Sequence, residues 1–292
     1  MAKETGDIKE IKPVLTRYIG NSIILLEEEP VPCDRAIHDV RVLMKKARAA
    51  LKLLAGQPAM EYTGRNLEDL REVGRKMRKW REDCVHRRTL RGLKKEFPSL
   101  FERLAGIEHV TRLLNIRNEL SQGSENIKYE IREVVTLLKK TGYRIRFLTM
   151  DKPDHAKLFR ELEASYERVV DRYLTCRNSR KPEDIHEFRK STKDLLYQVT
   201  FFRPLNPVHV RTFERRVDAI TDGLGRYNDL AQLVTALGYK YSNGRNPPTL
   251  DELVLRIREK QDRYLEKTWP RAFRMFNPGQ DIAGLLGFYI KM

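Results

Sequence analysis

A short pattern, Ile-His-acid-x-Arg-x-x-x-Lys, occurs twice in this sequence, and it limits the possible folds more than any other feature. Its histidine and basic members are His38, Arg41 and Lys45 in the first copy and His186, Arg189 and Lys193 in the second. Residues three and four positions apart share one face of an α-helix, so each copy places a histidine and two cations in one row. The copies lie 148 positions apart in a chain of 292 residues, which indicates an internal duplication. We expect the two matched rows to build one anion site from both halves.

The rest of the sequence predicts an all-α protein. Apolar residues recur at helical spacing nearly throughout, and alternating runs of β-branched residues are almost absent. Helices are expected at residues 7–29, 34–55, 66–95, a pair across 99–120, 125–149, 153–177, 183–203, 207–237 and 250–276. Pro, Gly and polar stretches separate these segments, and Asp34, Asp151 and Thr249 are the expected N-caps.

The order of the segments predicts two four-helix bundles related by a pseudo-twofold axis. The boundary is expected near Met150, which gives an N-terminal half of residues 1–150 and a C-terminal half of residues 151–292. The first half carries an insertion, residues 94–120, that has no counterpart in the second. An apolar tail at residues 282–290 is expected to pack onto the body of the protein, and a contact with a partner is the alternative.

The charge of the chain indicates a polyanionic partner. With 57 Lys and Arg against 41 Asp and Glu, the net charge is +16, which suits nucleic acid, an anionic membrane or a phosphate polymer. Charge alone does not choose among them. No stretch approaches the roughly 18 apolar residues of a spanning helix, and the first ten residues are too polar for a secretory signal. We therefore expect a cytoplasmic protein with three reduced cysteines.

The first row is longer than the second. Arg48 and Lys52 continue it at helical spacing beside an apolar stripe, so the row borders the core where a helix meets a groove. In the second copy, Leu196 and Thr200 stand at the matching positions, and Lys190 and Tyr197 are additional candidates. The first half is therefore expected to hold more of a ligand's charge.

Two further basic rows are candidates for the same groove. One lies on the last long helix and comprises Arg256, Lys260, Arg263, Lys267 and Arg271, with the acidic residues on a neighbouring strip. The other is shorter and includes Arg75 and Arg78. A single basic row is most often a solvated helix face. Several rows that border apolar stripes, two of which open with the same motif, favour a shared binding site.

The sequence offers little catalytic chemistry. No GxSxG signature is present, and Gly223-Leu224-Gly225 lacks the Lys-Ser/Thr ending of a phosphate loop. Cys84 and His86 are two positions apart on a predicted helix, where side chains diverge. A metal site built from His38 and His186 stays open as a minor alternative, although HExxH spacing is absent. We expect a protein that is not an enzyme and has no metal or other cofactor.

These motifs resemble those of the CHAD family, the conserved histidine α-helical domain. The resemblance rests on residues 37–48 and their weaker copy at residues 185–193, with further echoes in Arg81-Glu82-Asp83 and Arg226-Tyr227-Asn228-Asp229. It implies two four-helix bundles around a central basic cavity that binds inorganic polyphosphate, and an association with polyphosphate granules. The phosphate contacts that it implies are His38, Arg41, Lys45, Lys46, Arg48, His186, Arg189 and Lys193.

The predicted function is therefore non-catalytic binding of inorganic polyphosphate in a groove lined by both halves. A nucleic-acid-binding helical protein is the main alternative, because both ligands are polyanions. Base stacking would need exposed aromatic side chains among the cations, whereas Trp80, Phe188 and Phe202 fall on apolar stripes. Protonation of the two motif histidines would add charge, so affinity is expected to rise as the pH falls.

Overall fold

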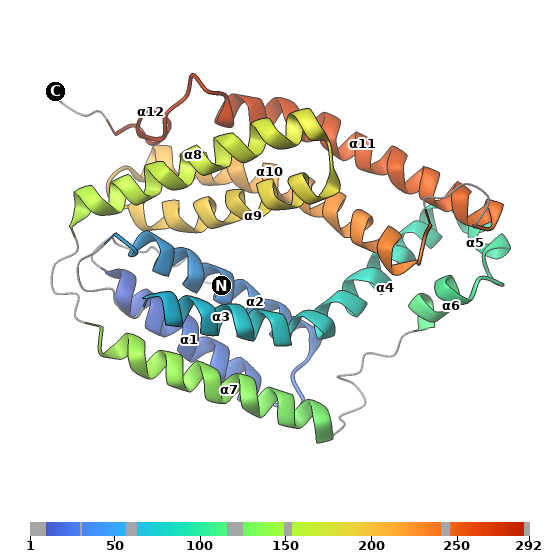
Figure 1. Ribbon diagram of the computed structural model, residues 1–292, viewed down its shortest axis with the longest axis horizontal. Coiled ribbons are helices and arrows are strands. Elements are labelled where there is room, and N and C mark those ends of the chain that lie inside the picture. The colour runs from blue at the N-terminus through green and yellow to red at the C-terminus, as the bar shows by residue number, and fades with distance from the viewer. Residues whose placement is uncertain are drawn as a thin grey trace.

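The computed structural model describes residues 10–29, 31–56, 63–115, 125–148, 154–240 and 246–288, and this part of the chain is helical without a strand (Figure 1). The predicted all-α fold is confirmed. The helices are α1 (Ile11–Glu27), α2 (Asp34–Leu53), α3 (Thr63–Lys76), α4 (Arg78–Glu96), α5 (Pro98–Arg103), α6 (Glu108–Asn115), α7 (Glu125–Arg146), α8 (His155–Ser179), α9 (Pro182–Val199), α10 (Pro207–Ala236), α11 (Pro248–Phe276) and α12 (Ile282–Leu286), with a 3₁₀ turn, η3 (Thr200–Phe202), after α9. None of them combines the length and apolarity that a membrane span needs, within the described residues.

The long helices form two groups that meet along α2 and α9. Helices α1, α2, α3 and α7 pack together, and so do α8, α9, α10 and α11 (Figure 1). One buried apolar cluster runs through both groups, and it includes Ile37 and Val40 of α2 and Ile185 and Phe188 of α9. The two groups share this core. Their pseudo-twofold relation and the boundary near Met150 stay predictions.

The single helix expected at residues 66–95 is wrong, because the chain bends at Met77 between α3 and α4. The last carbonyls of a helix have no intrahelical donor. Arg41 of α2 supplies one, since its Nη1 donates to the Gly74 carbonyl oxygen at 2.8 Å. The bend directs α4 away from the first group and onto α10. A side chain from another helix thus donates a hydrogen bond to the end of α3, and the sequence of α3 itself does not predict this contact.

The predicted insertion packs on the second half of the chain rather than on the first. Its helix pair is confirmed as α5 and α6. Together with the end of α4, these helices form a second buried apolar cluster with α10 and α11. It includes Leu93, Phe101 and Val110 as well as Leu233 of α10 and Leu253 of α11. The insertion and α4 therefore join the two groups at one end of the molecule (Figure 1).

Several helix ends differ slightly from the expectations. Cys33 precedes α2 and Pro247 precedes α11, so Asp34 and Thr249 are already helical. Asp154 caps α8 by accepting from the N–H groups of Ala156 and Lys157, whereas the expected cap Asp151 lies outside the described residues.

The apolar tail packs onto the body of the protein, as expected, over its described residues 282–288. Ile282 and Leu286 are buried. The ring of Phe288 lies 5.7 Å from that of Phe159 and 6.3 Å from that of Phe202. The tail therefore covers one end of the second helix group.

Candidate functional site

Helices α2 and α9 carry the two copies of the motif and lie side by side. Gln198 Nε2 donates to the Ala49 carbonyl oxygen at 3.3 Å, and Lys52 forms an ion pair with Asp194. The first contact joins positions 149 apart, close to the 148-residue offset of the two copies. Nearly equivalent positions of the duplicated helices therefore face each other.

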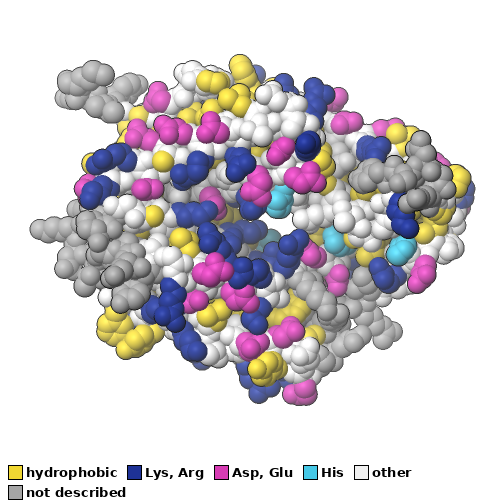
Figure 2. Space-filling view, viewed as in Figure 1, with side chains coloured by type: hydrophobic (Ala, Val, Ile, Leu, Met, Phe, Trp, Pro, Cys, Tyr) yellow, Lys and Arg dark blue, Asp and Glu magenta, His cyan; other side chains and the backbone are white. Residues whose placement is uncertain are grey.

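Basic side chains from three helices converge at this contact (Figure 2). We call them the central cationic cluster, which comprises Arg41, Lys45 and Arg48 of α2, Arg81 of α4, and Arg189 and Lys193 of α9. Lys45 is at its centre. Burial, together with the positive charges of Arg189 and Arg41, lowers the pKa of the Lys45 ammonium to about 8. Five of these six residues were expected from the sequence, and Arg81 is an addition.

Figure 2 shows Lys and Arg side chains gathered at the middle of this face, beside histidine side chains. Burial lowers the pKa of Arg41 and of Arg48. The nearby carboxylates of Glu82 and Asp194 oppose these shifts. Positive charges held this close repel one another, so the cluster is suited to an anion that carries several charges.

Arg189 offers an unused donor at the centre of the cluster. Its Nε is buried and has no hydrogen-bond partner among the described residues. Gly225 of α10 makes room for the guanidinium, because a Cβ at that position would lie 3.4 Å from Nε. A buried donor without a partner costs free energy, which an acceptor from a ligand would recover.

The two motif histidines differ in their surroundings. His186 is half-buried, and its Nδ1 faces Asn228 Oδ1 at 2.6 Å. The amide oxygen is an acceptor, so Nδ1 carries the proton and Nε2 of the neutral ring is left as an acceptor. Burial lowers the pKa of His186. In His38, which is exposed on α2, partial desolvation and then the charge of Arg81 lower the pKa.

The other expected site residues have described contacts outside the cluster. Lys190, Arg75 and Arg78 are exposed and pair with glutamates on their own helices. Arg78 is also near enough to the cluster for its charge to lower the pKa of Arg41. Lys46 lies over the Tyr18 ring, 5.6 Å from its centroid. Lys52 pairs with Asp194.

The basic row of α11 reaches the end of α4. Arg256 lies over the Phe97 ring, and both Lys260 and Arg263 pair with Glu96. Lys267 and Arg271 are exposed. These contacts place the start of the row beside the insertion, and its role in ligand binding stays a prediction.

Sequence reasoning did not include Arg81 and Asp229 among the phosphate contacts, although both lie in the family echoes, and it named Tyr197 only as an addition to the second row. Arg81 continues the spacing of the short basic row by three residues after Arg78, so that signal was present. Burial raises the pKa of Tyr197 to about 12, and Lys193 Nζ lies 6.0 Å from its ring centroid. Burial also raises the pKa of Asp229, against the charges of Arg189 and two arginines of α4. Only the packing of α10 on α4 places this carboxyl near the cluster.

The described residues contain no group of three or more His, Cys, Asp or Glu side chains arranged to hold a metal ion. The Cys84 thiol donates to Asp34 Oδ2 at 2.8 Å, and burial together with this carboxylate raises its pKa. A raised pKa disfavours the thiolate, which is the reactive form. Cys84 is therefore not an activated nucleophile.

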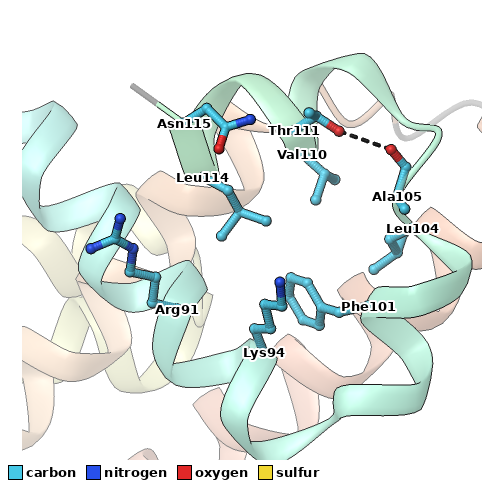
Figure 3. A pocket seen from close by; sticks show the side chains of 9 residues that line it. All are labelled: Arg91, Lys94, Phe101, Leu104, Ala105, Val110, Thr111, Leu114 and Asn115. Atoms are coloured by element: carbon cyan, nitrogen blue, oxygen red, sulfur yellow. Dashed lines mark hydrogen bonds between the residues drawn. The ribbon is translucent and has the colours of Figure 1, made fainter. Parts of the chain in front are cut away.

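A cavity of about 380 Å³ lies in the insertion, away from the cluster (Figure 3). Its floor is apolar, with Phe101, Leu104 and Leu114, and Arg91 and Lys94 project from α4 at one side. Thr111 Oγ1 donates to the Ala105 carbonyl oxygen at 3.0 Å, which closes the turn between α5 and α6. The cavity is thus a feature of the insertion rather than of the two motif helices.

Comparisons with known proteins agree on the fold. The crystal structure of the CHAD domain from the plant Ricinus communis is similar, with a TM-score of 0.53, 17% sequence identity, and coverage of 99% of this chain and 95% of that chain. No curated protein matches the sequence. The family model of the CHAD domain matches residues 24–238, which include both motif helices and the whole central cationic cluster. The chain therefore belongs to the CHAD domain family.

Proposed function

We propose that this protein binds inorganic polyphosphate at the central cationic cluster and performs no reaction on it. The observation that carries the proposal is the convergence of cations from α2, α4 and α9 around Lys45, whose pKa is lowered to about 8. Resemblance to the CHAD family implies the same ligand. Polyphosphate has about one negative charge per internal unit, so a binder needs several neighbouring cations rather than a closed cage.

The side chains of the cluster suit a flexible phosphate chain. Arg guanidinium groups can grip two phosphate oxygens at once, and Lys45 and Lys193 act as adaptable point charges. The Arg189 Nε supplies a buried donor. Partial burial strengthens each of these contacts relative to open water.

A nucleic acid is the competing ligand of this proposal. Stacking of bases would need exposed aromatic rings among the cations. The exposed large aromatic residues of the described chain include Tyr129 and Tyr143 of α7, Phe147 just after α7, and Phe273 of α11, and none of them is on α2, α4 or α9. This distribution favours a ligand without bases.

The test is a competition between long-chain polyphosphate and single-stranded oligonucleotides, at equal phosphate concentration and one ionic strength. Polyphosphate is expected to bind more tightly. The double variant Arg41→Ala with Arg189→Ala should weaken polyphosphate binding by about tenfold or more, because each charge-assisted hydrogen bond contributes about 1.5–3 kcal/mol.

The matched control removes two charges outside the cluster, with Arg75→Ala and Lys190→Ala. Both residues are exposed and paired with glutamates, so binding should change little. An equal loss in the two double variants would contradict a defined site, and preference for the oligonucleotide would favour the alternative ligand.

Two further expectations belong to this proposal. Incubation with polyphosphate and Mg²⁺ should release no phosphate, since the site holds cations rather than clustered carboxylates. A fluorescent fusion should collect on polyphosphate granules in cells that form them, and the Arg41→Ala with Arg189→Ala variant should stay diffuse in the cytoplasm.

A further inference from the structure

A polar pocket of about 340 Å³ lies where α2, α8 and α9 meet, and it shares no residue with the central cationic cluster. Its lining residues all carry polar side chains, and they are Lys52, Ser165, Arg168, Asp171, Arg172, Thr175, Ser191, Asp194 and Gln198. Helical spacing explains the arrangement. The α8 residues follow one face of that helix, and the three α9 residues recur at intervals of three and four.

The α8 side of the pocket carries a net positive charge, because Arg168 and Arg172 outnumber Asp171. Arg168 and Arg172 are four positions apart, and Lys52 approaches them from α2. Arg168 Nη2 donates to Ser165 Oγ at 2.7 Å, which orients this guanidinium. Two guanidinium groups and an ammonium around one space are suited to a phosphate group.

The α9 side needs hydrogen-bond donors. Gln198 is 1% exposed, and its Nε2 is used by the Ala49 carbonyl oxygen at 3.3 Å. Its Oε1 is buried and has no partner among the described residues. Asp194, on the same side, uses Oδ2 in its ion pair with Lys52, and its other carboxylate oxygen is a second acceptor. A buried acceptor without a donor costs free energy, so a ligand that brings a hydroxyl would be favoured here.

We propose that this pocket binds a small phosphorylated polyol. Its phosphate lies against Arg168, Arg172 and Lys52, and its hydroxyl groups donate to Gln198 Oε1 and Asp194. A condensed phosphate chain has no hydroxyl donors, so it satisfies the basic side alone. The volume is near the lower end of the range for small-molecule sites, about 300–1,000 Å³, which suits a sugar phosphate.

The experiment uses glucose 6-phosphate as the probe, with glucose and inorganic phosphate as its two parts, in calorimetric titrations of the full chain. The Arg41→Ala with Arg189→Ala background weakens anion binding at the cluster, so the outcome is independent of the proposed polyphosphate function. Glucose 6-phosphate should bind saturably with a Kd below about 1 mM. It should bind at least about tenfold more tightly than glucose or inorganic phosphate alone.

Two pocket variants and one control variant locate the binding. Arg172→Ala should weaken glucose 6-phosphate by about tenfold, and Arg160→Ala, exposed on the same helix outside the pocket, should leave it unchanged. Gln198→Met should weaken glucose 6-phosphate more than inorganic phosphate, because it removes the acceptor for a hydroxyl.

Three results would overturn the proposal. The first is no saturable binding of the probe. The second is binding that Arg172→Ala leaves intact. The third is displacement of the probe by an equal concentration of tripolyphosphate, which would make the pocket a site for phosphate groups alone.

Discussion

At the scale of single residues, the charge of Lys45 links stability to binding. Burial and the neighbouring arginines hold its pKa near 8, below the ordinary value of 10.5. The folded protein therefore carries, at neutral pH, a charge that the unfolded chain accommodates more easily. The charge of Lys45 is therefore expected to lower the folding stability of the free protein and to raise its affinity for a polyanion.

The Lys45→Met variant tests this trade-off. At about pH 7 it should raise the free energy of unfolding by on the order of 1–2 kcal/mol, since one pKa unit corresponds to about 1.4 kcal/mol, and it should weaken polyphosphate binding. Because the folded pKa lies below the unfolded one, the wild type gains stability as the pH rises from about 8 to 10.5, and the advantage of the variant shrinks. Urea unfolding at about pH 7 and pH 9.5 measures both effects.

Lys190→Met, at an exposed and paired position, is the control and should change stability by less than about 0.5 kcal/mol. A less stable Lys45→Met protein at both pH values would contradict the argument.

The histidines give the site a second dependence on pH. His38 and His186 have pKa values below the ordinary 6.5, so both are neutral at pH 7 in the free protein. A polyanion favours the charged ring and raises these pKa values on binding. Affinity for polyphosphate should therefore increase as the pH falls from 7 through about 6, over a range in which circular dichroism shows that the protein stays folded.

His186→Gln should flatten this dependence of affinity on pH, whereas His155→Gln, at an exposed position of α8, should not. A profile that is already flat in the wild type would mean that the histidines serve structure only.

At the scale of helices, close packing of α10 on α11 fixes the second group. Gly223 of α10 faces Thr268 of α11 so closely that an added Cβ would overlap Thr268 Oγ1. This hydroxyl donates to the Tyr264 carbonyl oxygen at 2.6 Å, and a threonine in a helix has few other rotamers. The two helices can approach this far only because position 223 has no side chain.

Gly223→Ala should therefore destabilise the protein by about 1–3 kcal/mol in chemical unfolding, although alanine is the better helix former. Gly20→Ala on α1 is the matched control, because its Cβ would meet no described atom within 4 Å, and it should stabilise by up to about 1 kcal/mol. Thr268→Ala should recover part of the loss in a double-mutant cycle. Additive effects of the two substitutions would show that the contact is not the cause.

At the same scale, one sequence-based prediction was wrong, namely the single helix at residues 66–95. The pattern at residues 66–95 is continuous, yet the chain bends at Met77, where Arg41 donates to the Gly74 carbonyl oxygen. Periodicity reports which face of a segment is apolar. It does not report that a side chain 33 positions away in the chain will donate a hydrogen bond to a carbonyl at the end of the helix.

At the scale of the whole molecule, the net charge of +16 predicts opposite effects of salt on the free protein and on the complex. Salt screens the repulsion among the cations, so NaCl should raise the Tm of the free protein modestly. Polyphosphate binds the folded state and should raise the Tm further, by an amount equivalent to about 2.7 kcal/mol at a concentration of 100 Kd. This second shift should shrink as salt increases, because the same screening weakens binding. Thermal scans over a matrix of salt and polyphosphate concentrations separate the effect of salt on the free protein from its effect on the complex. If saturating polyphosphate left the Tm unchanged, this would contradict binding to the folded state.

The sequence by itself determined the all-α class, most helix positions, the duplicated motif and the basic rows, because helical periodicity and charge are written along the chain. It also identified five of the six cluster residues, since Arg41, Lys45, Arg48, Arg189 and Lys193 recur at helical spacing. Tertiary structure alone decided which rows meet. The packing of α2 on α9 brings Lys45 close to Arg189, and the bend at Met77 brings in Arg81, while the rows of α3 and α11 pair with neighbouring carboxylates. The physical reason is that a pKa shift or an unpaired donor arises from the distances between helices, and no spacing within one helix encodes them.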